Sequence, residues 1–230
     1  MENSALTVGK STAMEREEKL LRLRFLYLLF AAQVGLAVLG ATLALRGVVK
    51  LGGGKLALPA ALLCVGVLLV IYFLPMVRSP PISWGLYATF ALSFAVAAVG
   101  ATLGDPDRLV YSWLWAVFGA AVVLAGFFLS AGSYPSTLAS VLMVVGGAAP
   151  ALLGCLVLGE AEPWQAALVF LAAAVFSFYI SYQHRSAVRN SLWDFDRDEA
   201  VSGSVRLWLD GLLGLCRTAE LFCRPLSALN

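Results

Sequence analysis

Long apolar segments, each about the length needed to cross a lipid bilayer, follow one another along most of this chain. A transmembrane helix needs roughly 20 mostly apolar residues. The segments are separated by clusters of proline, glycine and charge, such as Gly104-Asp105-Pro106. Seven segments have this form, at 25–45, 56–77, 82–104, 109–130, 136–159, 164–182 and 205–223. The sequence therefore predicts an all-α membrane protein with seven transmembrane helices.

The composition agrees with a chain that lies in lipid. Of its 230 residues, 60% are hydrophobic and 13% are charged, and the mean hydropathy is +0.85. An ordinary soluble domain is roughly 45–50% apolar and about 25% charged. A chain of this size cannot bury so much apolar surface in one water-soluble core. The lipid bilayer is therefore the first expected partner, and a net charge of +2 gives no reason to expect nucleic acid.

The chain divides into a polar N-terminal segment at 1–24, a transmembrane domain at 25–223 and a short tail at 224–230. The apolar run 25–45 is too long for the core of a signal peptide, so we expect it to be retained as the first span. With seven spans, nine Lys and Arg residues lie on the N-terminal side of the membrane and five on the other. Because basic residues favour the cytosolic side, the N-terminal segment is predicted to be cytosolic.

The seventh segment carries four charged residues, Arg206, Asp210, Arg217 and Glu220. At about 100° per residue they fall within an arc of roughly 80°, which makes one charged stripe along a helix. A charge at the bilayer centre costs about 2.5–3.5 kcal/mol, so the stripe is expected to face the bundle interior or water. One hypothesis is a cation pathway with Asp210 as its titratable group. The alternatives are an amphipathic helix at the membrane surface and a static salt-bridge network.

Few other residues could carry chemistry. His184, the only histidine, ends the sixth segment, where it could sense pH or simply face the membrane surface. The acidic stretch 194–199 has the spacing of a calcium loop, but Glu199 stands where that loop needs glycine, so we expect a solvated acidic loop. The four cysteines lack metal-site spacing, and no catalytic motif is present. We therefore predict no enzymatic activity, no resident metal and no cofactor.

Several short motifs, taken in order, resemble one family. They are 23–33 in the first segment, 78–81 with Thr89-Phe90 around the third, 176–182 at the end of the sixth, and Leu207-Trp208-Leu209-Asp210 in the seventh. By their order and spacing the chain resembles the Bax inhibitor-1 family, also called transmembrane Bax inhibitor motif proteins. The resemblance covers nearly all of the chain after residue 20.

This resemblance implies a central, semi-polar seventh helix surrounded by the other six. It also implies that Asp210 corresponds to one of two acidic residues that form a pH-sensitive pair in the family. The second acid corresponds to Gln183, which cannot ionise, so an Asp210–Gln183 hydrogen bond would replace the shared proton. Arg78 corresponds to the family's basic residue at the end of span two, where it would tune the gate together with His184 and Glu220.

The function that the resemblance implies is a cation leak, chiefly of calcium, that regulates calcium homeostasis and apoptosis. Arg206 and Arg217 would then tune Asp210. The divergent seventh segment and the Ala, Gly, Leu and Val content also resemble the branch of this family carried by cytomegaloviruses, which implies modulation of a host. The alternative is a non-transporting protein that binds and retains host membrane proteins in immune evasion. The expected location is the endoplasmic reticulum or another endomembrane, or the plasma membrane.

Overall fold

The computed structural model describes residues 2–48, 55–105, 109–130, 136, 138–139, 141–142, 145–146, 148–149, 162–189 and 199–227. Side chains are described over a smaller part, which excludes 2–20, 128–130, 180–181, 183–189, 199, 219 and 221–227. Within these ranges the protein is helical and has no strand, which confirms the predicted all-α class. The helices are α1 (Glu2–Leu45), α2 (Ala57–Phe73), the short 3-10 helix η1 (Pro75–Arg78), α3 (Ile82–Gly104), α4 (Leu109–Ser130), α6 (Pro163–Arg189) and α7 (Glu199–Ser227).

Three helical segments are long and apolar enough to cross a membrane, so the chain is a membrane protein: Leu21–Leu45, Ile82–Gly104 and Leu109–Phe127. At 1.5 Å per residue, the shortest of these, with 19 residues, is about 29 Å long, close to the thickness of a bilayer's hydrocarbon core. Two shorter apolar helices, Ala57–Phe73 and Pro163–Tyr179, run beside them. The predicted fifth segment, 136–159, lies mostly outside the described residues.

The predicted boundaries hold where the sequence provides strong stop signals. Helices α3 and α4 begin and end at the predicted residues, between Pro81 and the Gly104-Asp105 pair and then from Leu109 onward. The predicted second segment is too long, because α2 ends at Phe73 rather than at residue 77. Pro75 causes the early end, since a proline pushes the residue before it out of the helical conformation, and Leu74 has φ −113° and ψ 89°.

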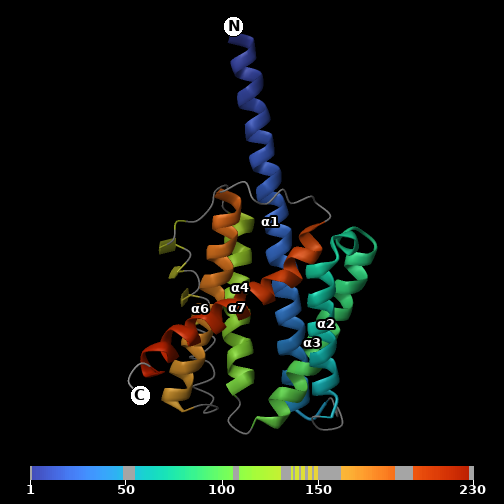
Figure 1. Ribbon diagram of the computed structural model, residues 1–230, viewed down its shortest axis with the longest axis vertical. Coiled ribbons are helices and arrows are strands. Elements are labelled where there is room, and N and C mark those ends of the chain that lie inside the picture. The colour runs from blue at the N-terminus through green and yellow to red at the C-terminus, as the bar shows by residue number, and fades with distance from the viewer. Residues whose placement is uncertain are drawn as a thin grey trace.

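The seventh helix differs most from its prediction. It begins at Glu199 and ends at Ser227, so it is longer at both ends than the predicted 205–223. Glu199 is therefore the first residue of a helix and not part of an acidic loop, whereas 194–198 lie outside the described residues. Figure 1 shows α7 crossing the bundle obliquely at about half its height, while α1, α3 and α4 run roughly parallel to one another.

The first helix begins well before the bundle. α1 has 44 residues, about 66 Å, and Figure 1 shows its N-terminal half projecting beyond the other helices. The predicted polar segment 1–24 is therefore mostly a helical extension of the first span. The apolar half of α1 packs against α3, α4 and α7 and occupies the middle of the bundle.

Small residues and hydrogen bonds join the helices of the bundle. On α1, Ala37 and Ala41 have no exposed surface, and small residues of this kind let helix backbones approach closely in lipid. The hydroxyls of Thr42 on α1 and Tyr111 on α4 are 3.0 Å apart. Tyr87 on α3 donates to the Leu29 carbonyl of α1 at 3.1 Å. These contacts fix α1, α3 and α4 against one another.

Candidate functional site

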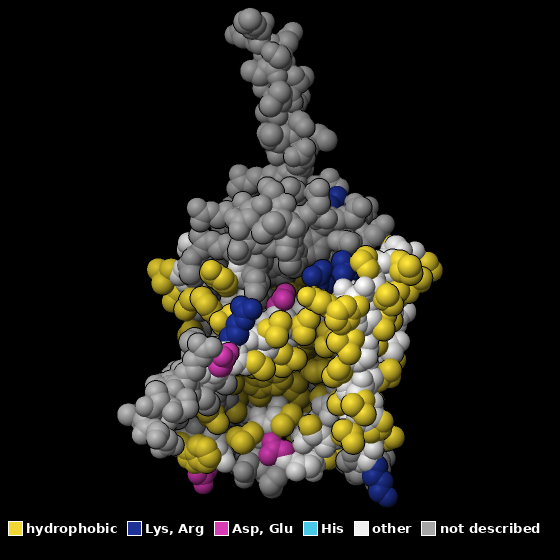
Figure 2. Space-filling view, viewed as in Figure 1, with side chains coloured by type: hydrophobic (Ala, Val, Ile, Leu, Met, Phe, Trp, Pro, Cys, Tyr) yellow, Lys and Arg dark blue, Asp and Glu magenta, His cyan; other side chains and the backbone are white. Residues whose placement is uncertain are grey.

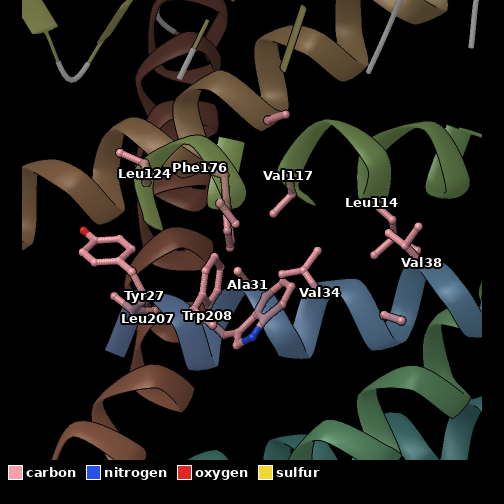
Figure 3. Packing of buried hydrophobic residues seen from close by; sticks show 14 of the residues in the cluster. Tyr27, Ala31, Val34, Val38, Leu114, Val117, Leu124, Phe176, Leu207 and Trp208 are labelled. Carbon is pink, nitrogen blue, oxygen red and sulfur yellow. The ribbon is translucent and has the colours of Figure 1, made fainter. Parts of the chain in front are cut away.

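The centre of the bundle is an aromatic cluster around Trp208 of α7. The indole of Trp208 is 2% exposed, and rings from four other helices surround it. The ring centroids lie 4.2 Å from Phe94, 5.2 Å from Phe30, 5.5 Å from Phe176 and 6.4 Å from both Phe90 and Trp113. Figure 3 shows Trp208 beside Ala31 and Val34 of α1, with Phe176 pointing toward it. We call these six rings the Trp208 cluster.

The Trp208 cluster lies near the middle of the membrane-spanning part. Phe94 is 12 residues after the start of α3 at Ile82 and 10 residues before its end at Gly104. The Phe94 ring touches Trp208 more closely than any other ring of the cluster. The segment of α7 that carries Trp208 therefore lies about halfway between the two ends of a helix that can span the bilayer.

A buried polar group is built into the apolar cluster. The indole N–H of Trp208 donates to the side-chain carbonyl of Gln33 on α1 at 2.9 Å. The amide nitrogen of Gln33 points to the hydroxyl of Ser204, one turn earlier on α7, at 3.4 Å. Ser204 in turn donates to the Val201 carbonyl at 2.7 Å. Gln33 and Ser204 have no exposed surface, so this network replaces hydrogen bonds to water that the core cannot supply.

Two glycines let α7 approach α6 closely. A Cβ atom at Gly211 would overlap the ring of Phe176, and one at Gly214 would overlap Tyr179. Both glycines are buried, and each lies against an aromatic ring of α6. The buried part of α7 therefore includes Ser204, Trp208 and these two glycines.

The predicted charged stripe lies on the opposite face of α7. Asp210 and Arg206 are half-buried and one helical turn apart, and the positive charge of Arg206 acts on the Asp210 carboxylate. Arg217 and Glu220 are exposed. Figure 2 shows positive and negative side chains alternating along the oblique path of α7 on one face of the molecule. Of the two environments expected for the stripe, the bundle interior is wrong for Arg217 and Glu220, and contact with water stays a prediction. The core position belongs to Trp208.

The other predicted residues are placed as follows. Arg78 binds the end of α2, because its Nε donates to the Ile71 carbonyl and its Nη2 to the Tyr72 carbonyl, both at 3.0 Å. The negative end of the helix dipole also stabilises a cation at this position. Gln183 and His184 belong to the last turns of α6, but their side chains lie outside the described ones. The predicted contact between Asp210 and Gln183 stays a prediction.

Sequence reasoning named Gln33 and Trp208 only as parts of motifs and missed Ser204. A signal was available, because Gln33 is the one strongly polar residue inside an otherwise apolar first span and needs a partner in lipid. Trp208 carries a donor suited to that amide. Nothing in the sequence gives the distance in space between residues that are 175 positions apart.

Comparisons of the chain with models of protein families, with curated proteins and with solved structures find no match. The resemblance to the Bax inhibitor-1 family therefore stays a hypothesis, supported by the motifs quoted above. Over the part of the chain that the structure describes, His, Cys, Asp and Glu side chains do not gather in threes as a metal site would require.

Proposed function

We propose that the protein is a multi-pass membrane protein of an internal membrane through which cations, chiefly calcium, leak under the control of α7. The observation that carries the proposal is the position of Asp210, a half-buried carboxylate two residues beyond Trp208 on a helix that crosses an apolar bundle. Ionisable residues at such depth are expensive and usually serve ion or proton movement. The choice of calcium rests on the family resemblance.

The Trp208 cluster suggests how the leak would be closed. Six aromatic rings and the Gln33 hydrogen bond fill the space where α1, α3, α4, α6 and α7 meet. A cation could pass beside α7 only if this helix shifted and carried Trp208 with it. The close approach of Gly211 to Phe176 makes the contact with α6 the natural pivot for that movement.

The test is calcium flux into liposomes that contain the purified protein. In a partly buried site, a carboxylate attracts a cation about 4 Å away by roughly 4 kcal/mol. The positive charge of Arg206 cancels part of the attraction that Asp210 would exert on a passing cation. We therefore expect Asp210→Asn to lower the flux by about tenfold, which corresponds to about 1.4 kcal/mol. The matched control is Glu162→Gln, which removes the same charge at an exposed position just before α6 and outside the stripe. Equal flux in wild type and Asp210→Asn would contradict the role of Asp210.

A second candidate is a non-transporting protein that binds and retains host membrane proteins. Two observations favour it: the exposed charges of Arg217 and Glu220, and a glutamine at position 183 where the related family has an acid. This function predicts no calcium flux from wild-type protein in liposomes. It also predicts normal surface levels of the client in cells that express Arg217→Glu, and reduced levels in cells that express wild type. A pH-dependent flux gained by Gln183→Asp would instead favour the leak.

A further inference from the structure

The exposed face of α7 carries charges in an order that is complementary to itself. Along this face the described residues are Arg206, Asp210, Leu213, Arg217 and Glu220, spaced by four, three, four and three residues. Spacing of this kind keeps side chains on one seam of a helix. Leu213 is 48% exposed and stands at the centre of the seam. Arg206 and Glu220 are each seven residues from Leu213, and Asp210 and Arg217 are three and four residues from it.

We infer that this seam binds a second copy of the chain, with Leu213 of each copy on a two-fold axis. Reversing the seam about Leu213 brings each Asp210 opposite Arg217 of the other copy, and each Arg206 toward Glu220 of the other copy. A two-fold interface of this kind is closed and uses the same patch on both chains. Opposite charges that meet across an interface fix its register.

The need for a cover comes from the depth of the seam in the membrane. Trp208, which lies between Arg206 and Asp210 in the sequence, touches the middle of α3. Charges that face lipid at this depth cost about 2.5–3.5 kcal/mol each on insertion scales. Leucines on a lipid-facing surface need no partner, whereas Arg217 is an exposed charge and Asp210 has one basic neighbour, Arg206, on its own helix. A second copy supplies both opposite charges at once.

The oblique path of α7 decides which pairs matter most. Two copies in one membrane share an orientation, so their two-fold axis runs along the membrane normal and the two α7 helices cross instead of lying along each other. The residues nearest to the crossing point, Asp210, Leu213 and Arg217, are then in reach. Arg206 and Glu220 lie farther out and also interact within their own chain, so the interface rests on the three central residues.

The first experiment is oxidative cross-linking of Leu213→Cys in membranes, in a background with Cys216→Ser and Cys223→Ser. We expect a disulfide-linked dimer. The matched control is Leu69→Cys, because Leu69 on α2 is 51% exposed and lies on a face without charges. It should give no dimer. A monomer from both variants, equal cross-linking of both, or a cross-link of residue 213 to a different protein would overturn the proposal.

The second experiment tests the charges with two differently tagged single variants. Asp210→Arg alone and Arg217→Asp alone each put like charges together at both central pairs, and we expect each to dimerise at least about tenfold more weakly than wild type. Mixed, they restore both pairs, so the heterodimer should recover most of the wild-type affinity. Heterodimers as weak as either homodimer would overturn the proposal. Calcium flux is measured on the same samples, and dimerisation with or without flux separates this inference from the proposed leak.

Discussion

Replacing Gln33 by leucine removes the acceptor that holds Trp208 in the bundle. The Trp208 N–H lies 2.9 Å from the Gln33 carbonyl oxygen, and both side chains are inaccessible to solvent or nearly so. Leucine has almost the volume of glutamine and keeps the apolar contacts of α1. The substitution therefore tests the polar network itself, because it leaves a buried donor without its partner.

The expected loss of stability in Gln33→Leu follows from two general magnitudes. Leaving a buried donor unsatisfied costs about 1–3 kcal/mol in proteins generally. Hydrogen bonds between helices in a membrane average about 0.6 kcal/mol and reach about 1.7 kcal/mol. Since this bond has the usual length of a well-formed hydrogen bond and is buried, we expect Gln33→Leu to lower the free energy of unfolding by about 1–2 kcal/mol. Trp208→Phe should cost more, because it also leaves a cavity within the aromatic cluster.

The assay is a double-mutant cycle on unfolding in mixed micelles, with wild type, Gln33→Leu, Trp208→Phe and the double variant. If the two side chains are bonded, the double variant is more stable than the sum of the single losses predicts, by about 0.6–1.7 kcal/mol. The control cycle pairs Gln33→Leu with Ser93→Ala, because Ser93 bonds to Cys64 between α2 and α3. Additive losses within about 0.5 kcal/mol for Gln33 and Trp208 would refute the reasoning.

Three further substitutions have effects that follow from single contacts, and the midpoint of thermal unfolding in detergent measures all of them. Gly211→Ala should destabilise the protein by about 1–3 kcal/mol, because the added Cβ would overlap the Phe176 ring of α6. The control Gly66→Ala has open space around it and should be neutral or stabilising by up to about 1 kcal/mol. Equal effects of the two substitutions would contradict the close contact between α6 and α7. Arg78→Ala should cost about 1–2 kcal/mol, because it removes the donors to two carbonyls at the end of α2. Arg78→Lys should cost less, since it keeps a positive charge there. No loss in the alanine variant would argue against a stabilising role of these two hydrogen bonds. Thr42→Val should cost about 0.6 kcal/mol through the lost bond to Tyr111, and a fully tolerated change would mean that this bond does not form in lipid.

The bounds of α3 and α4 were predictable because the length of an apolar run, and the proline, glycine and charged residues that end it, are local properties of the sequence. Pro81 and Gly104-Asp105 bound α3 at the residues where the structure begins and ends it. The end of α2 was missed because residues 74–77 are as apolar as the helix before them, and only the steric effect of Pro75 on Leu74 ends it. Local chemistry of this kind is readable from the sequence when more weight is given to proline than to hydropathy.

The orientation of α7 was not predictable in the same way. A helix with charges on one face and leucines on the other can turn either face inward, because in a membrane both water-filled interiors and lipid are available environments. Three contacts determine which face turns inward. Gly211 lies against Phe176 and Gly214 against Tyr179 of α6. The Trp208 indole donates to the Gln33 amide of α1. That fit depends on α6 and also on α1, whose Gln33 lies 175 positions from Trp208 in the sequence.

The most direct test of this account is cross-linking between α1 and α7 within one chain. A short bifunctional thiol reagent is applied in membranes to two double variants, both without the native cysteines: Gln33→Cys with Ser204→Cys, and Gln33→Cys with Arg206→Cys. We predict an intramolecular cross-link for the pair with Ser204, whose hydroxyl lies 3.4 Å from the Gln33 amide, and none for the pair with Arg206 on the opposite face of α7. Cross-linking of the Arg206 pair in preference to the Ser204 pair would mean that the charged stripe, and not Trp208, faces the bundle core.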